Sequence, residues 1–158
     1  MQRLNVSVSR RLLDAILASG EEESVSTKQL AQTVSELSRI FTKERDRLSL
    51  SYLDSSHLGA AYLQYFLPVN LAKIQRLLNE MPTPELEESF SVLDLGSGPG
   101  TGALGVLDWW HQQALPYPLS VTAVDGSKAA LSQARQLWDR YCQAATVGAA
   151  SLQTYEGD

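Results

Sequence analysis

Apolar residues in the first half of the chain recur at intervals of three and four, which is the spacing of one buried helix face. This pattern predicts a first helix over residues 12–17 that ends at Gly20. A second helix is predicted from Ser26, where Gln29 completes a capping box, through Phe41.

Two further helices are predicted before residue 82. The third begins near Asp54 or Ser55. Pro68 is expected to break or restart it, because proline has no N–H to donate inside a helix. The fourth helix covers residues 71–78 and stops before Pro82.

The hydrophobic pattern changes after residue 90. Short apolar runs over 91–95, 119–124 and 151–155 read as strands, and helical patterns over 101–113 and after Ser127 separate them. Alternating strands and helices predict a parallel sheet with right-handed crossovers.

The chain is therefore expected to have an α/β fold in two parts. A helical N-terminal region over 1–81 and a linker over 82–90 precede an α/β domain over 91–158. Sheets commonly have about five or six strands, whereas this pattern supplies about three. We expect a truncated Rossmann-like fold, completed by a longer protein, by an oligomer or by strands from another chain.

Composition adds limits to this picture. The chain has 158 residues, 44% hydrophobic and 20% charged, which is typical of a globular protein. The net charge is -5, and all of it comes from residues 61–158, because residues 1–60 carry equal numbers of basic and acidic side chains. Such a charge disfavours binding of nucleic acid by bulk electrostatics, so any RNA contact would use the N-terminal half.

The sequence also indicates a cytoplasmic protein. No apolar stretch is long enough to cross a membrane, and residues 1–20 lack the apolar block of a signal peptide. The single cysteine, Cys142, excludes an internal disulfide and is expected to be an inert core thiol. His57 and His111 have no partners at metal-ligand spacing, so no metal site is predicted.

A glycine-rich turn follows the first predicted strand. Ligands of open α/β sheets bind at the carboxyl ends of the strands, and glycines there let a ligand approach the backbone. An acidic residue at the end of the second strand is placed to accept the hydroxyls of a ribose. We therefore predict a site for an adenosine-type ligand, formed by Asp94, Gly96, Ser97, Gly98, Gly100, Asp125, Gly126 and Ser127.

Two ligand classes fit this turn unequally. The dinucleotide pattern G-x-G-x-x-G meets Thr101 at its last position when started at Gly96, and the tolerable Ala103 when started at Gly98, so an NAD-dependent oxidoreductase fits loosely. The pattern Asp94-x-Gly96-x-Gly98-x-Gly100 resembles the first motif of class I S-adenosylmethionine-dependent methyltransferases. A carboxylate beside the turn also suits a cationic sulfonium better than it suits a pyrophosphate.

A longer resemblance is carried by two segments. Residues 62–74 read YLQYFLPVNLAKI, and residues 92–101 read VLDLGSGPGT. Together they resemble the methyltransferase-like proteins associated with the small ribosomal subunit of mitochondria and bacteria. The resemblance implies a helical N-terminal region, a class I methyltransferase domain that binds S-adenosylmethionine, and a role in ribosomal RNA methylation or small-subunit assembly.

The chain departs from that family in two ways. Members carry a cysteine cluster linked to an iron–sulfur centre, whereas this sequence has only Cys142. The strands that would hold the target base are also missing, so no catalytic residue is assigned and the chain is interpreted as the cofactor-binding part of an enzyme. A non-catalytic ribosome-assembly module with the same fold is the alternative, and an NAD-dependent oxidoreductase is a weaker one.

An aromatic stripe precedes the linker. Tyr62, Tyr65 and Phe66 lie at helical spacing, which suits an aromatic lid over a ligand or a stacking platform for a base. Such stripes more often belong to a hydrophobic core, and we favour that interpretation.

Overall fold

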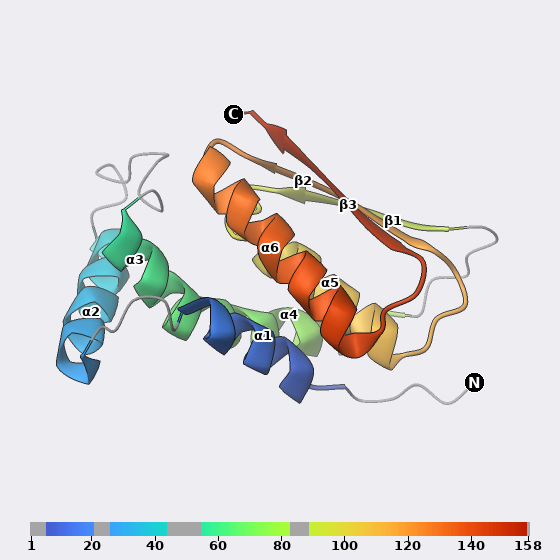
Figure 1. Cartoon of the computed structure of the whole chain (residues 1–158), viewed down its shortest axis with the longest axis horizontal. Coiled ribbons are helices and arrows are strands. Elements are labelled where there is room, and N and C mark those ends of the chain that lie inside the picture. The colour runs from blue at the N-terminus through green and yellow to red at the C-terminus, as the bar shows by residue number, and fades with distance from the viewer. Residues whose placement is uncertain (1–5, 21–25, 44–54, 83–88, 158) are drawn as a thin grey trace.

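The computed structural model describes residues 6–20, 26–43, 55–82 and 89–157. The first half consists of α1 (Arg10–Gly20), α2 (Thr27–Lys43), α3 (Ser56–Ala61), the π turn η3 (Tyr62–Phe66) and α4 (Leu67–Glu80). The second half alternates β1 (Phe90–Leu95), α5 (Thr101–Gln112), β2 (Leu119–Asp125), α6 (Lys128–Ala145) and β3 (Ala150–Glu156), as Figure 1 shows. The predicted helices and strands are confirmed within a few residues.

The three strands form one parallel sheet in the order β1-β2-β3. Helices α5 and α6 cover one face of it, so the described part of the chain is a mixed α/β structure with a Rossmann-like arrangement (Figure 1). The predicted α/β class is confirmed to this extent. Of the predicted linker, residues 83–88 lie outside the described ranges, and Phe90 is the first residue of β1.

The other face of the sheet has no cover from any described element. On this face the register aligns Leu95 of β1 with Val124 of β2 and Tyr155 of β3. Leu93 and Leu95 are 62% and 71% exposed, and Tyr155 is 55% exposed. Parallel sheets are normally covered on both faces, whereas the described residues cover this sheet on one face only.

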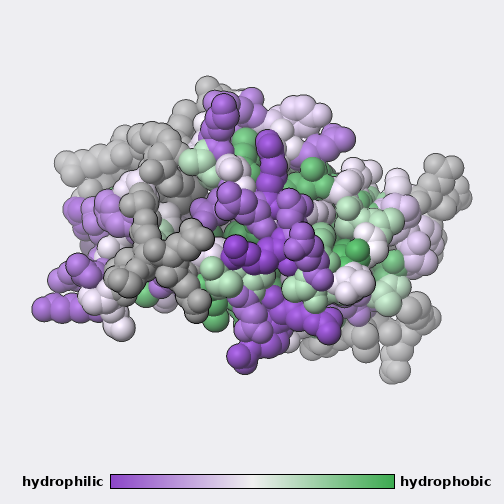
Figure 2. All heavy atoms as spheres, viewed as in Figure 1, coloured by the Kyte–Doolittle hydropathy of each residue, from purple (hydrophilic) through white to green (hydrophobic). Residues whose placement is uncertain are grey.

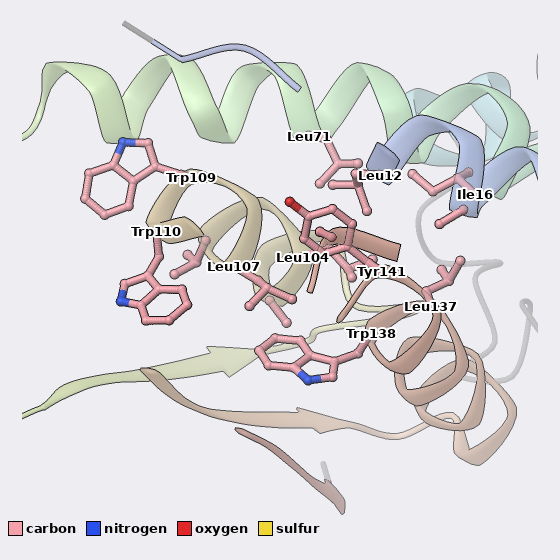
Figure 3. Close-up of a cluster of buried hydrophobic side chains, with 14 of the residues drawn as sticks. Leu12, Ile16, Leu71, Leu104, Leu107, Trp109, Trp110, Leu137, Trp138 and Tyr141 are labelled. Atoms are coloured by element: carbon pink, nitrogen blue, oxygen red, sulfur yellow. The ribbon is translucent and has the colours of Figure 1, made fainter. Parts of the chain in front are cut away.

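The hydrophobic core has two parts, one between the sheet and helices α5 and α6, the other between these helices and α1 and α4 (Figure 3). Leu12 of α1, Leu71 of α4, Leu104 of α5 and Tyr141 of α6 meet in the second part, and each is almost fully buried. The N-terminal helices therefore share a core with the α/β part. Helix α4 approaches α5 closely at Gly105, because this residue has no side chain: a Cβ there would lie 2.8 Å from Ile74 Cγ2.

A fully buried carboxylate, Asp108, lies within this core. Its Oδ1 accepts a hydrogen bond of 2.5 Å from the Tyr141 hydroxyl, and its Oδ2 accepts one of 2.5 Å from Gln75 Nε2. The Ser9 N–H donates to the same Oδ2 at 2.9 Å, and Gln112 Nε2 donates to it at 3.1 Å. The network thus joins the segment before α1 to α4, α5 and α6. Burial, and then the bond to Asp108, raise the pKa of Tyr141 above its ordinary value.

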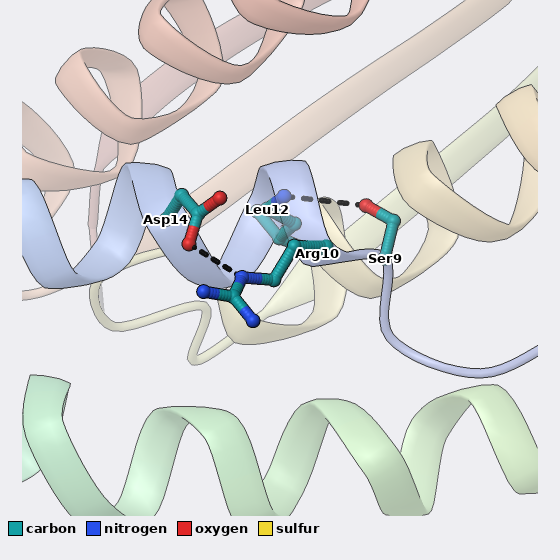
Figure 4. Close-up of polar contacts among 4 residues, drawn as sticks. All are labelled: Ser9, Arg10, Leu12 and Asp14. Carbon is teal, nitrogen blue, oxygen red and sulfur yellow. Dashed lines mark hydrogen bonds and ion pairs between the residues drawn. The ribbon is translucent and has the colours of Figure 1, made fainter.

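Side chains also set the starts of α1 and α2. The Ser9 hydroxyl accepts a hydrogen bond of 3.2 Å from the Leu12 N–H, and the exposed pair Arg10–Asp14 follows within the first turns (Figure 4). At α2 the predicted capping box is confirmed, because Ser26 N–H donates to Gln29 Oε1 and Gln29 N–H donates to Ser26 Oγ. Such caps contribute about 1 kcal/mol each.

Pro68 lies where the helix restarts, which is one of the two predicted outcomes: the regular helix α3 ends at Ala61, and α4 begins at Leu67 with the proline in its first turn. Helices α3 and α4 continue into each other through the π turn η3, and the Leu67 N–H donates to the Tyr62 carbonyl five residues earlier. The physical reason is that Pro68 lies at the start of α4, where its missing N–H and its ring are accommodated by widening the preceding turn.

The outward side of α6 is polar, and Figure 2 shows hydrophilic side chains gathered over this helix. Its exposed residues include Arg135, Gln136 and Asp139. Among the helices that the structure describes, none is long and apolar enough to cross a membrane.

We predict that Tyr141→Phe lowers the free energy of unfolding by about 1–3 kcal/mol, because it removes a donor from a buried carboxylate. Urea denaturation would measure this change. Tyr155→Phe is the matched control, since the Tyr155 hydroxyl is exposed and only donates to Gln153 at 3.3 Å. Equal stabilities of the two variants would contradict a structural role for the Asp108 network.

Candidate functional site

The glycine turn lies at the carboxyl ends of β1 and β2. Its backbone is tied to β2, because the N–H groups of Gly96 and Ser97 both donate to the Val124 carbonyl, at 2.9 and 3.0 Å. The turn then closes with a bond of 2.9 Å from the Gly100 N–H to the Ser97 carbonyl.

Three glycines of the motif adopt left-handed backbone. Their φ angles are +67° at Gly96, +51° at Gly98 and +87° at Gly100. A side chain at Gly100 would also lie 2.9 Å from Ala134 Cβ, whereas one at Gly96 would meet no atom within 4 Å. Gly100 is therefore required by packing as well as by conformation, and Gly96 leaves its backbone open to a ligand.

Asp94 holds the first turn of α5. Its Oδ2 accepts a hydrogen bond of 2.9 Å from the Ala103 N–H, and the helix needs this partner because its N-cap residue, Gly100, has no side chain. A Cβ at Gly102 would lie 2.5 Å from the same oxygen. Gly102 is thus a site residue that the sequence analysis did not assign, although it is the last glycine of the Gly96–Gly102 run.

Asp125 connects the turn to the start of α6. Its Oδ2 accepts from the Gly98 N–H at 2.7 Å, and its Oδ1 accepts from the Ser127 N–H at 2.8 Å. Ser127 in turn caps α6 by accepting from the Ala130 N–H at 3.1 Å. The structure therefore brings Asp125, Gly98 and Ser127 together, and half-buried Gly126 lies between β2 and α6.

The site is electrostatically negative where the two carboxylates approach each other. Burial is the main cause that raises the pKa of Asp94, and the nearby charge of Asp125 raises it further. The hydrogen bond from Ala103 acts in the opposite direction. A positively charged group placed between these carboxylates would relieve their repulsion.

Ser97 supplies a polar group inside the turn. Its side chain is only 4% exposed, and its hydroxyl has no hydrogen-bond partner among the described residues. A buried hydroxyl without a partner is costly, so a ligand or an ordered water is expected to complete it.

The aromatic stripe borders the site at one point. The Tyr62 hydroxyl lies 3.2 Å from Thr101 Oγ1, which belongs to the first residue of α5. Tyr65 is 50% exposed, so the interpretation of the whole stripe as core is wrong for this residue.

Comparison with known proteins adds no family: no family model matches this chain, and no curated protein is significantly similar to it. The class of ligand is therefore inferred from the geometry of the glycine turn and its two carboxylates.

We predict that Gly102→Ala lowers the free energy of unfolding by about 1–2 kcal/mol, since the new methyl group would collide with Asp94. The higher helix propensity of alanine would offset part of this loss. Gly148→Ala is the control, because a Cβ at Gly148 would meet nothing within 4 Å. Urea denaturation of both variants measures the difference, and a Gly102→Ala protein as stable as the control would contradict the contact.

A second prediction concerns pH. Because the folded state raises the pKa of Asp94 above 3.8, the folded protein keeps this proton after the unfolded chain has lost it. The free energy of unfolding should therefore fall as the pH rises above 3.8, until the folded Asp94 has also ionised. Asp94→Asn removes this contribution. Urea denaturation from about pH 3.5 to 6 should show the wild type losing stability relative to Asp94→Asn, and parallel curves would contradict it.

Proposed function

We propose that this chain binds S-adenosylmethionine and is the cofactor-binding part of a class I methyltransferase. The observation that carries the proposal is the pairing of a left-handed glycine turn with two carboxylates, Asp94 and Asp125, at the carboxyl edge of a parallel sheet.

The residues present fit this cofactor. The open backbone at Gly96 and the unpaired hydroxyl of Ser97 offer contacts for the methionine end. Asp125 uses two of its roughly four lone-pair positions on Gly98 and Ser127, so the others remain for ribose hydroxyls. When bound, S-adenosylmethionine supplies a methyl group activated by a positively charged sulfur. The chain's own residues would orient it and keep water away from it.

The charges favour this ligand over a dinucleotide. A pyrophosphate in a Rossmann fold binds at the helix N-terminus that follows the glycine turn. Here the carboxylate of Asp94 already accepts from the Ala103 N–H in that first turn. A negative pyrophosphate would be repelled by Asp94 and Asp125, whereas a sulfonium and an ammonium would be attracted.

The methyl acceptor is proposed from the resemblance of residues 62–74 and 92–101 to the methyltransferase-like proteins of the small ribosomal subunit. This resemblance supports ribosomal RNA as the substrate of a methyltransferase. It equally supports a role in small-subunit assembly, in which the fold is retained without catalysis. The methyltransferase version requires S-adenosylmethionine to bind to the turn, whereas the assembly module keeps the fold with or without this ligand.

Calorimetric titration tests the proposal. S-adenosylmethionine should bind to the wild-type chain, and Asp125→Ala should raise its Kd by at least about tenfold, because a charge-assisted hydrogen bond to the ribose is lost. Glu156→Ala is the control. Glu156 is an exposed carboxylate aligned with Asp125 on the neighbouring strand, so its removal changes the charge equally and should leave the Kd unchanged.

NAD serves as the competing titrant in the same experiment. Binding of NAD in place of S-adenosylmethionine, or binding of neither, would overturn the proposed function. An unchanged Kd in Asp125→Ala, with S-adenosylmethionine bound by the wild type, would remove Asp125 from the ribose site.

A further inference from the structure

The first turn of α5 is held from two sides. Asp94 reaches it from β1 and accepts from the Ala103 N–H. From the helical half of the chain, the Tyr62 hydroxyl lies 3.2 Å from Thr101 Oγ1. Thr101 is 7% exposed and directly follows Gly100, the residue with the largest positive φ of the turn. A contact at Thr101 therefore constrains the glycine turn itself.

The π turn η3 is what directs Tyr62 toward α5. In an unbroken α-helix, Tyr62 and Ile74 would lie about 120° apart around the axis, because each residue advances by roughly 100°. Each residue of a π turn advances by only about 80°, so the turn from Tyr62 to Phe66 brings Tyr62 to within roughly 30° of Ile74. Ile74 is the residue whose side chain meets α5 at Gly105. One face of the helix thus carries both contacts to α5.

Aromatic contacts hold the ring of Tyr62 in this position. It stacks on Phe66 at a centroid distance of 6.0 Å. Phe66 in turn meets Phe41 of α2 and Tyr65 edge-on, each at 5.2 Å. With its ring held by these neighbours, the Tyr62 hydroxyl reaches Thr101 at little further entropic cost.

We propose that Tyr62 is a positioning residue for the cofactor site: through Thr101 it fixes the glycine turn in its ligand-ready form. The identity of the ligand rests on the proposed function, whereas the effect of Tyr62 on the conformation of the turn does not.

The first test needs no ligand. Amide hydrogen exchange of Gly98, Gly100, Thr101 and Gly102 is measured in the full chain for Tyr62→Phe, Thr101→Val and the double variant. Each single variant should speed exchange in the turn by about fivefold, and the double variant should match the singles, since both remove the same hydrogen bond. Tyr65→Phe is the control, because Tyr65 also packs on Phe66 but is half exposed.

The second test repeats the titration with S-adenosylmethionine. Tyr62→Phe, Thr101→Val and the double variant should each raise the Kd by about fivefold, and Tyr65→Phe should leave it unchanged. Turn exchange and Kd at wild-type values in Tyr62→Phe would overturn the inference, as would effects that multiply in the double variant. If the wild type does not bind S-adenosylmethionine, the proposed function fails, and the exchange experiment still decides the role of Tyr62.

Discussion

The arrangement of the helices depends on the buried carboxylate of Asp108. Three donors from distant parts of the chain, at Ser9, Gln75 and Tyr141, and a fourth from the same helix, Gln112, converge on its two oxygens. A buried carboxylate is tolerated only while it is hydrogen-bonded, so moving α4, α6 or the segment before α1 away from α5 would remove one of its donors. This constraint joins the N-terminal helices to the α/β part more specifically than apolar packing would.

The same constraint reaches the candidate site through α4. Gln75 fixes one point of α4 on α5, and the close approach of Ile74 to Gly105 fixes a neighbouring point. With these contacts set, the π turn at the other end of the helix brings Tyr62 to Thr101. The position of the glycine turn is therefore linked to the core through a helix that belongs to the opposite half of the sequence.

Sequence reasoning succeeded where the signal was local and failed where it was not. Residues that are close in sequence determine the capping box of Ser26 and Gln29, the strands and the glycine turn, and each of these features is present in the structure. The role of Asp108 depends on partners up to 99 positions away in the sequence, so no local pattern predicts it. The restart at Pro68 was predictable because proline suits the first turn of a helix, but the π turn that precedes it was not. The need for glycine at Gly102 arises only once Asp94 lies against it.

The candidate site concentrates features that do not favour the stability of the folded chain. Burial, and to a lesser degree the nearby charge of Asp125, raise the pKa of Asp94, and the hydroxyl of Ser97 is buried with no partner among the described residues. A chain optimised only for folding would replace such groups, because each lowers its stability. A cationic ligand with hydrogen-bonding groups reverses both costs at once, so its binding would stabilise the folded state. The least favourable contacts of the apo chain thus lie where a ligand of that chemistry would gain the most.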